Sequence, residues 1–140
     1  MNATYFLLDI FEFIKKAYSI MFWRPYVAVK VQLVPPKDKS SRPDQIAFTV
    51  INESGPDIEI KEAWFLTNYN RQIFSPHIES RLPEKVLHKD RAIYFVPFEE
   101  IQTALNKGIG ETITQAAVFD KAEHLHTGRV DTKAELIFAK

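Results

Sequence analysis

The chain has 140 residues and no cysteine, which excludes disulfide bonds, thiolate metal sites and a cysteine nucleophile. Glycine is also scarce. The four glycines are scattered, and Gly108 and Gly110 form a G-x-G without the third glycine of a phosphate-binding loop. The chain also has no excess of either charge, since its 18 acidic and 18 basic residues give a formal net charge of zero. A neutral chain without a basic stripe has no general attraction for nucleic acid, so we expect no nucleic-acid partner.

Catalytic motifs are equally scarce. Neither Ser54-Gly55 nor Ser75-Pro76 lies in a G-x-S-x-G nucleophile elbow. The adjacent carboxylates Glu99 and Glu100 would point about 100° apart on a helix, so they suit the first turn of a helix better than an acid–base pair. The sequence therefore predicts a protein without catalytic residues and without a cofactor.

Large apolar side chains are in excess near the N-terminus. Between Tyr5 and Trp23, polar residues recur every three or four positions, which places them on one narrow stripe of a helix. These polar residues are Asp9, Glu12, Lys15, Lys16 and Ser19. The rest of the circumference is apolar, and its candidate interaction residues are Phe6, Ile10, Phe13, Ile14, Phe22 and Trp23. We expect residues 1–24 to form this helix ahead of a separate domain over 25–140.

The charges on this helix indicate which surface would cover it. A cleaved secretory signal fits poorly, because no basic region precedes the apolar run and no small-x-small site follows it. Each charged residue would cost on the order of 3 kcal/mol at the bilayer centre, against about 0.5 kcal/mol gained per large apolar residue. We therefore expect a packed or interfacial amphipathic helix. Its own domain, a second copy, a partner protein and a membrane surface remain the alternatives.

From residue 25 onward, alternating apolar residues predict short strands. Pro25 ends the helix. The strands are predicted at about 27–33, 45–51, 58–68, 72–74, 92–96, 113–119 and 129–138. The turn residues over 52–57 predict a hairpin between the second and third strands. The alternation slips near Glu62 and Ala63, which indicates a bulge. One short internal helix is predicted over 98–105, with an acidic first turn.

Short strands with turns about every eight to twelve residues are typical of an antiparallel two-sheet sandwich of about six to eight strands. A barrel is the closest alternative. The segments Phe48–Pro56, Tyr94–Glu100 and Thr127–Arg129, together with Trp64 on a long strand, resemble small bacterial immunoglobulin-like domains of unassigned function, over about residues 27–138. The resemblance implies a mainly β, immunoglobulin-like sandwich and carries no chemistry.

His124 and His126 are the best metal candidates, because residues two apart on a strand project to the same face. A zinc or iron site would need at least one further ligand. The candidates for it are Asp120, Glu123, His77 and His88. The alternative interpretation is two solvated histidines beside a hairpin turn. We adopt it, and we expect no metal.

The sequence thus predicts a non-enzymatic binding or assembly module whose apolar N-terminal helix mediates self-association or docking. A homodimer built on that helix is the most specific version, and the aromatic-rich strand around Trp64, Phe65 and Tyr69 is a second candidate contact. The alternatives are a membrane-associated protein, peripheral or signal-anchored, and a metal-dependent protein. We expect a cytoplasmic location. In the membrane alternative, Lys15, Lys16 and Arg24 would hold the domain at the inner face of the membrane.

Overall fold

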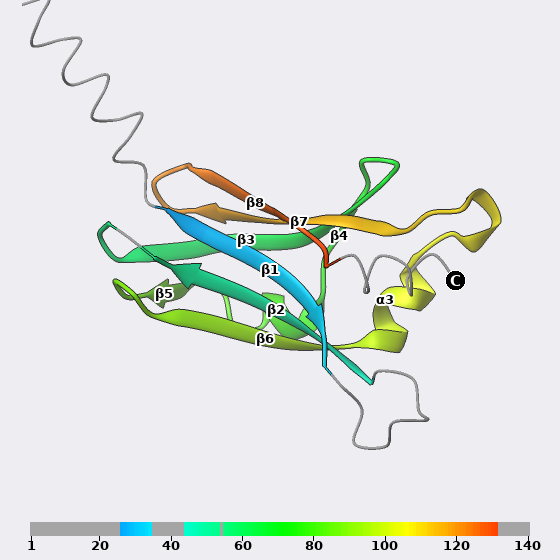
Figure 1. Ribbon diagram of the computed structural model, residues 1–140, viewed down its shortest axis with the longest axis horizontal. Coiled ribbons are helices and arrows are strands. Elements are labelled where there is room, and N and C mark those ends of the chain that lie inside the picture. The colour runs from blue at the N-terminus through cyan, green and yellow to red at the C-terminus, as the bar shows by residue number, and fades with distance from the viewer. Residues whose placement is uncertain (1–25, 35–43, 54, 132–140) are drawn as a thin grey trace, which may run out of the picture.

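The computed structural model describes residues 26–34, 44–53 and 55–131, which form two packed sheets (Figure 1). Sheet A contains, in spatial order, β1 (Val27–Leu33), β2 (Gln45–Asn52) and β6 (Arg91–Pro97). Sheet B contains, in spatial order, β4 (Gln72–Ile73), β3 (Ile58–Thr67), β7 (Ile113–Asp120) and β8 (Leu125–Arg129), and β5 (Glu84–Val86) also pairs with β3. The prediction of a mainly β architecture with two sheets of antiparallel strands is confirmed.

Short helices connect the strands. They are α2 (Pro76–Glu79), α3 (Phe98–Ala104) and the 3₁₀ helix η1 (Lys107–Ile109). The predicted internal helix is therefore confirmed as α3, which carries Glu99 and Glu100 in its first turn. The prediction of one such helix was wrong, because α2 and η1 are also present and are too short to show a period. α3 lies at the end of the sandwich opposite the start of β1 (Figure 1).

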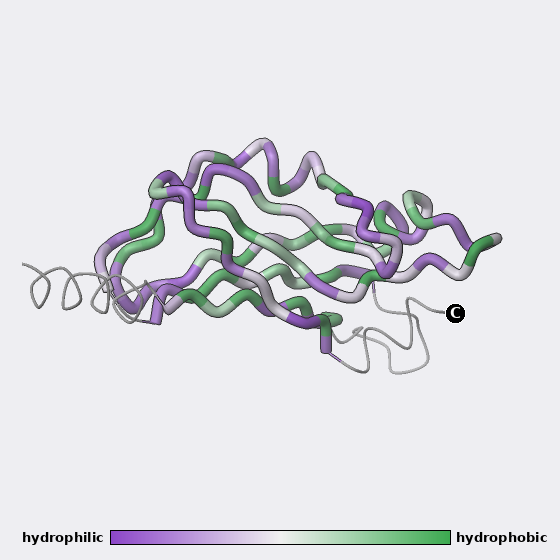
Figure 2. Tube along the Cα trace, turned by 90° about the horizontal axis from the view of Figure 1, so that it is seen from above, coloured by the Kyte–Doolittle hydropathy of each residue, from purple (hydrophilic) through white to green (hydrophobic). Residues whose placement is uncertain are grey.

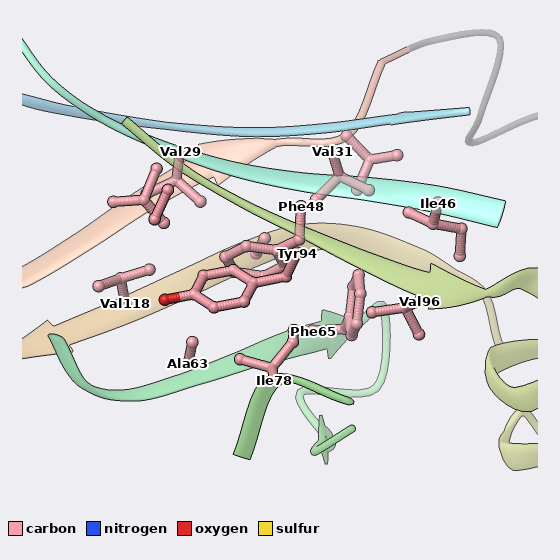
Figure 3. Close-up of a cluster of buried hydrophobic side chains, with 14 of the residues drawn as sticks. Val29, Val31, Ile46, Phe48, Ala63, Phe65, Ile78, Tyr94, Val96 and Val118 are labelled. Carbon is pink, nitrogen blue, oxygen red and sulfur yellow. The ribbon is translucent and has the colours of Figure 1, made fainter. Parts of the chain in front are cut away.

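Alternation along the strands decides which side chains fill the space between the sheets. On β1 and β2, every second residue is buried, and the same holds for Ala92, Tyr94 and Val96 on β6. Aromatic rings lie at the centre of this core (Figure 3). The ring of Phe48 meets that of Phe65 edge-on, with the centroids 5.3 Å apart. The hydrophobic stretches of the strands run side by side through the molecule, while many connections are hydrophilic (Figure 2).

The two sheets are joined along one edge, where β8 lies beside β1. Val31 and Val130 form a parallel bridge, and the Asp131 N–H donates to the Val31 carbonyl at 3.2 Å. The backbones approach closely at this edge, because a Cβ added to Gly128 would lie only 1.8 Å from the Val29 carbonyl oxygen. The start of β1 and the start of β8 therefore lie at the same end of the sandwich.

The outer edge of β6 is covered by Arg81, which follows α2. Arg81 Nη1 donates to the Ile93 carbonyl at 2.8 Å, and Arg81 Nη2 donates to Glu84 Oε1 at 2.8 Å. The guanidinium also lies over the ring of Tyr94, 4.4 Å from its centroid. The Tyr94 hydroxyl donates to Glu84 Oε2 at 2.6 Å. Burial, followed by this hydrogen bond, raises the pKa of Tyr94, so the phenol stays a donor.

The structure corrects three details of the strand predictions. The turn residues over 52–57 do not form a hairpin, because β2 belongs to sheet A and β3 to sheet B. The last strand begins at Leu125 rather than at Arg129, so Thr127 and Gly128 lie inside a strand and not in a turn. β5 was not predicted. The bulge expected near Glu62 is present as a shift of register between Ile60 and Glu62.

Within the described ranges, no helix is long and apolar enough to cross a membrane. The helix predicted over residues 5–23, and with it the proposed division at residue 24, lies outside the described residues. So does the part of the last predicted strand beyond residue 131.

Replacing Gly128 by alanine is expected to destabilise the fold by about 3 kcal/mol, because the new Cβ would force β8 away from the Val29 carbonyl. Urea denaturation followed by circular dichroism measures this loss. Gly108→Ala is the matched control, since its Cβ would meet only the Asn106 side chain, at 3.3 Å. The control should cost less than about 1 kcal/mol. Equal losses in the two variants would show that the β1–β8 contact is not tight.

Candidate functional site

The outer face of sheet B carries apolar side chains interrupted by Gln72, Gln115 and Thr127, which the strand register places on the same face. Ala63 and Phe65 belong to the core, so their neighbours Trp64 and Leu66 lie on the opposite, outer face of β3. The register extends this set to β7 and β8, since Trp64 pairs with Ala117 and Phe119 pairs with Leu125. We call the set the sheet B apolar surface; it consists of Trp64, Leu66, Phe74, Ala117, Phe119 and Leu125.

The most exposed members of the sheet B apolar surface lie at its margins. Trp64 is only 9% exposed, because it lies among neighbouring strands and contacts the ring of Phe74, with the centroids 5.9 Å apart. Phe74 and Leu125 are each 47% exposed. Charged residues flank the surface along the same face. Glu62 pairs with Phe119, and Arg129 pairs with Gln115 at the other end of β7. The surface is therefore an apolar patch with charges of opposite sign at its two ends.

The outer face of sheet A is also mixed. Phe95 is 51% exposed there, but it pairs with Ala47, which in turn pairs with Gln32. Lys30 and Arg91 point to the same outer face by register. Both outer faces therefore combine apolar and polar residues, and sheet B is the better candidate for a binding face because it carries Trp64, Phe74 and Phe119, whereas Phe95 is the aromatic residue on the outer face of sheet A.

The predicted second contact around Trp64 and Tyr69 is split by the structure. Trp64 lies on the sheet B apolar surface, whereas Tyr69 lies in the turn between β3 and β4. The Tyr69 hydroxyl donates to the Ile109 carbonyl at 2.6 Å, although its ring is half exposed. The other predicted interaction residues lie in the N-terminal segment, outside the described residues: Phe6, Ile10, Phe13, Ile14, Phe22 and Trp23. Sequence reasoning missed Leu66, Phe74, Ala117, Phe119 and Leu125.

His126 and Asp120 form a buried pair at the β7–β8 turn. His126 Nε2 lies 2.8 Å from Asp120 Oδ2, and His126 is only 7% exposed. The backbone N–H of His124 donates to Asp120 Oδ1 at 2.9 Å, which fixes the turn. The expectation of two solvated histidines is wrong for His126. Because β8 starts earlier than predicted, this side chain faces the interior.

Three of the predicted metal ligands meet, but their arrangement does not suit a metal ion. His126 Nε2 lies 2.8 Å from Asp120 Oδ2 and is hydrogen-bonded to it, and His124 Nδ1 lies 3.8 Å from the same oxygen. His77 lies beside Glu100, and His88 Nδ1 lies 2.7 Å from the Gly55 carbonyl. Among residues 26–34, 44–53 and 55–131, no three His, Asp or Glu residues are arranged to hold a metal ion.

A pocket of about 600 Å³ opens beside His124 at the same end of the sandwich. Two lysines line it, but each has a carboxylate partner: Lys85 lies 3.9 Å from Asp57 and Lys121 lies 3.8 Å from Glu59. These ion pairs are largely exposed, so each contributes about 0–1 kcal/mol. The balanced charges give the pocket no clear preference for an anion or a cation.

Ser75, His77 and Glu100 also come together, but in an order that does not activate the serine. The Ser75 hydroxyl donates to Glu100 Oε2 at 3.1 Å, and His77 Nδ1 lies 3.2 Å from the same oxygen. The Ser75 Oγ accepts the His77 backbone N–H, which caps α2. Because Ser75 is fully buried and its proton points to the carboxylate, the arrangement is a helix cap and not a nucleophile with its base.

At the opposite end of the sandwich, an ion pair holds three loops together. Arg71 Nε donates to Glu111 Oε2 at 2.9 Å, and Arg71 Nη2 contacts both Glu111 Oε1 and the Ala104 carbonyl. Glu111 is buried, and its Oε1 also accepts the Asn106 N–H at 3.0 Å. The hydrogen bond from Arg71, and to a lesser extent that from the Asn106 N–H, lower the pKa of the Glu111 carboxyl to about 2.

No family model, curated protein or solved structure matches this chain. Function is therefore inferred from the arrangement of the described residues.

The Glu111 carboxylate is expected to make folding pH-dependent. Its pKa falls from 4.5 in the absence of its partners to about 2 in the folded chain. The folded state therefore gains stability from this group above about pH 4.5 and loses it as the pH falls towards 2. Urea denaturation between pH 2 and pH 7 should show Glu111→Gln to be less stable than the wild type by about 1–3 kcal/mol at pH 7. The difference should shrink in acid.

Glu99→Gln is the matched control, because Glu99 lies on α3 away from this ion pair. It should follow the wild-type pH profile. A stability difference between Glu111→Gln and wild type that stays constant down to pH 2 would contradict the assigned role of Arg71.

Proposed function

We propose that this chain is a non-enzymatic binding or assembly module. The observation that carries this proposal is the sheet B apolar surface, on which Phe74, in contact with Trp64, and Leu125, paired with Phe119, are each 47% exposed. Such a patch on one face of a sheet, flanked by charged residues, is typical of a protein-interaction site. Three buried polar groups serve a turn, a helix cap and a loop, namely those of Asp120, Ser75 and Glu111.

The proposal includes an immunoglobulin-like sandwich. Two observations support this fold. The strand order is β1-β2-β6 in one sheet and β4-β3-β7-β8 in the other, and a parallel bridge connects β1 with the residue after β8. Sandwiches of this kind carry many unrelated functions, so the fold supports a binding scaffold and does not define its partner.

The N-terminal segment supplies the attachment in this proposal. Its apolar circumference requires a covering surface, and the narrow polar stripe makes a protein surface more favourable than the bilayer interior. Self-association through this segment, as a homodimer, is the version that we favour.

Deleting residues 1–24 is expected to leave a folded domain that no longer self-associates. The reason is that the described strands contain a continuous core of their own, from Val27 to Val130. Sedimentation velocity of the full chain and the deletion variant over a range of concentrations would measure this change. The full chain should sediment as an oligomer and the variant as a monomer.

A full-length variant provides the control. Ile10→Glu with Ile14→Glu places charge on the apolar side of the segment and should also abolish association, whereas Ser19→Glu adds a charge to the polar stripe and should not. If the deletion variant unfolds, the segment is part of the core of its own domain, and the proposed function is wrong.

A further inference from the structure

We propose that the pocket beside His124 binds a small zwitterionic ligand, namely a dipeptide with free ends and apolar side chains. The residues that line this pocket do not belong to the sheet B apolar surface, so the inference goes beyond the proposed function and does not depend on self-association. It follows from the walls of the pocket, from the alternating signs of its charges and from its size.

Hydrogen bonds between the segments that form the pocket hold its walls in place. The beginning of β3, β5 and the β7–β8 turn lie at the same end of the sandwich (Figure 1). Asn52 is fully buried, and its Nδ2 donates to the Pro56 carbonyl at 2.9 Å and to the Val86 carbonyl at 3.3 Å. Across the pocket, the Lys121 backbone N–H donates to the Glu59 carbonyl at 2.9 Å. A site whose walls are already tied together loses little freedom when a ligand binds.

Four charged side chains line the pocket in alternating order. Glu59 on β3 pairs in register with Lys85 on β5, so both side chains leave the sheet on the same face. Lys85 Nζ lies 3.9 Å from Asp57 Oδ2, and Lys121 Nζ lies 3.8 Å from Glu59 Oε2. The order across the pocket is therefore Asp57, Lys85, Glu59, Lys121, and each charge is followed by one of opposite sign.

Both ion pairs leave their charges open to a ligand. A charge-assisted hydrogen bond between an ammonium and a carboxylate is about 2.7–2.9 Å long. At 3.8 Å and 3.9 Å, the two pairs are therefore ion pairs without a hydrogen bond. The lysine side chains are also well exposed, Lys85 at 65% and Lys121 at 74%. A ligand that binds these groups displaces water rather than a hydrogen bond within the protein.

The alternating signs select the class of ligand. A simple anion drawn to the two lysines would also meet the two carboxylates, and a simple cation would be repelled by the lysines. A ligand with one ammonium and one carboxylate satisfies both signs at once. Asp120 offers no free oxygen, because its Oδ1 accepts the His124 backbone N–H and its Oδ2 is hydrogen-bonded to His126.

The size and the apolar part of the pocket favour a dipeptide over a single amino acid. Its volume of about 600 Å³ lies within the usual range of small-molecule sites. β5 and β7 flank β3, so the backbones of Lys85 and Lys121 lie two strand spacings apart, or roughly 10 Å. Two extended residues span about 7 Å. With the lysine side chains reaching inward, a dipeptide contacts both ion pairs, and its side chains pack against Pro56, Ile58 and Ala122.

The outermost charges fix the direction of the ligand. They are Asp57 at one side and Lys121 at the other, and they have opposite signs. The ammonium of the dipeptide therefore binds Asp57, and its carboxylate binds Lys121. Glu59 and Lys85, which are opposite each other in register, are then free to pair with one another.

The test titrates the full-length protein with leucyl-leucine and follows its ¹⁵N–¹H nuclear magnetic resonance spectrum. We expect saturable shifts at the amides of Glu59, Lys85 and Lys121. Two matched ligands lack one charge each: N-acetyl-leucyl-leucine has no ammonium, and leucyl-leucine amide has no carboxylate. Each should bind at least about tenfold more weakly, because one charge-assisted hydrogen bond is lost. Leucine should also bind more weakly, since it reaches only one ion pair.

A variant of the pocket provides the second measurement. Lys121→Gln should weaken the binding of leucyl-leucine at least about tenfold and remove its preference over leucyl-leucine amide. Lys30→Gln is the matched control, because Lys30 is an exposed lysine on the outer face of sheet A, and it should bind as the wild type does. Circular dichroism should show both variants to be folded, since both lysines are exposed.

Three results would overturn the inference. They are the absence of saturable shifts with leucyl-leucine, equal binding of the acetylated or amidated ligand, and equal binding by Lys121→Gln and Lys30→Gln. None of these measurements depends on whether the chain is a monomer or a dimer, so a failure of the dipeptide site leaves the proposed assembly function to its own test.

Discussion

The close approach of β8 to β1 is the constraint on which the other features depend. A backbone contact this tight is possible only because Gly128 has no side chain next to the Val29 carbonyl. It joins the two sheets along one edge and thereby fixes which faces are internal. His126 points inward to Asp120 as a result, while Leu125 and Thr127 remain on the outside. The same contact places the entry of the N-terminal segment next to the sheet B apolar surface.

Much of the fold could be predicted because period-two alternation is a local property. β1, β2, β6 and β7 each carry enough alternating or apolar residues to be recognised one strand at a time. The pairing of strands is not local, and this explains the wrong hairpin over 52–57. Turn residues over 52–57 indicate that the chain changes direction, but they do not indicate that β3 joins the other sheet. β5 has only three residues, too few to show a period.

The candidate site was less predictable for related reasons. Trp64 could be identified from its size, but its partners come from β7 and β8, more than fifty residues later in the chain. A signal was present in β7, where Ala116 and Val118 alternate with Ala117 and Phe119, so that both faces of the strand are apolar. No sequence pattern predicted the Arg71–Glu111 pair, because the two residues lie in different loops that meet only when the chain folds.

Arg81 has a further consequence, for solubility. The outer edge of β6 would otherwise present the Ile93 carbonyl to any extended chain nearby, and open edges of this kind template the growth of aggregates. By occupying that acceptor while its guanidinium stacks on Tyr94, Arg81 blocks strand addition at the middle of the edge. Arg81 thereby limits backbone pairing at this edge and opposes edge-to-edge aggregation.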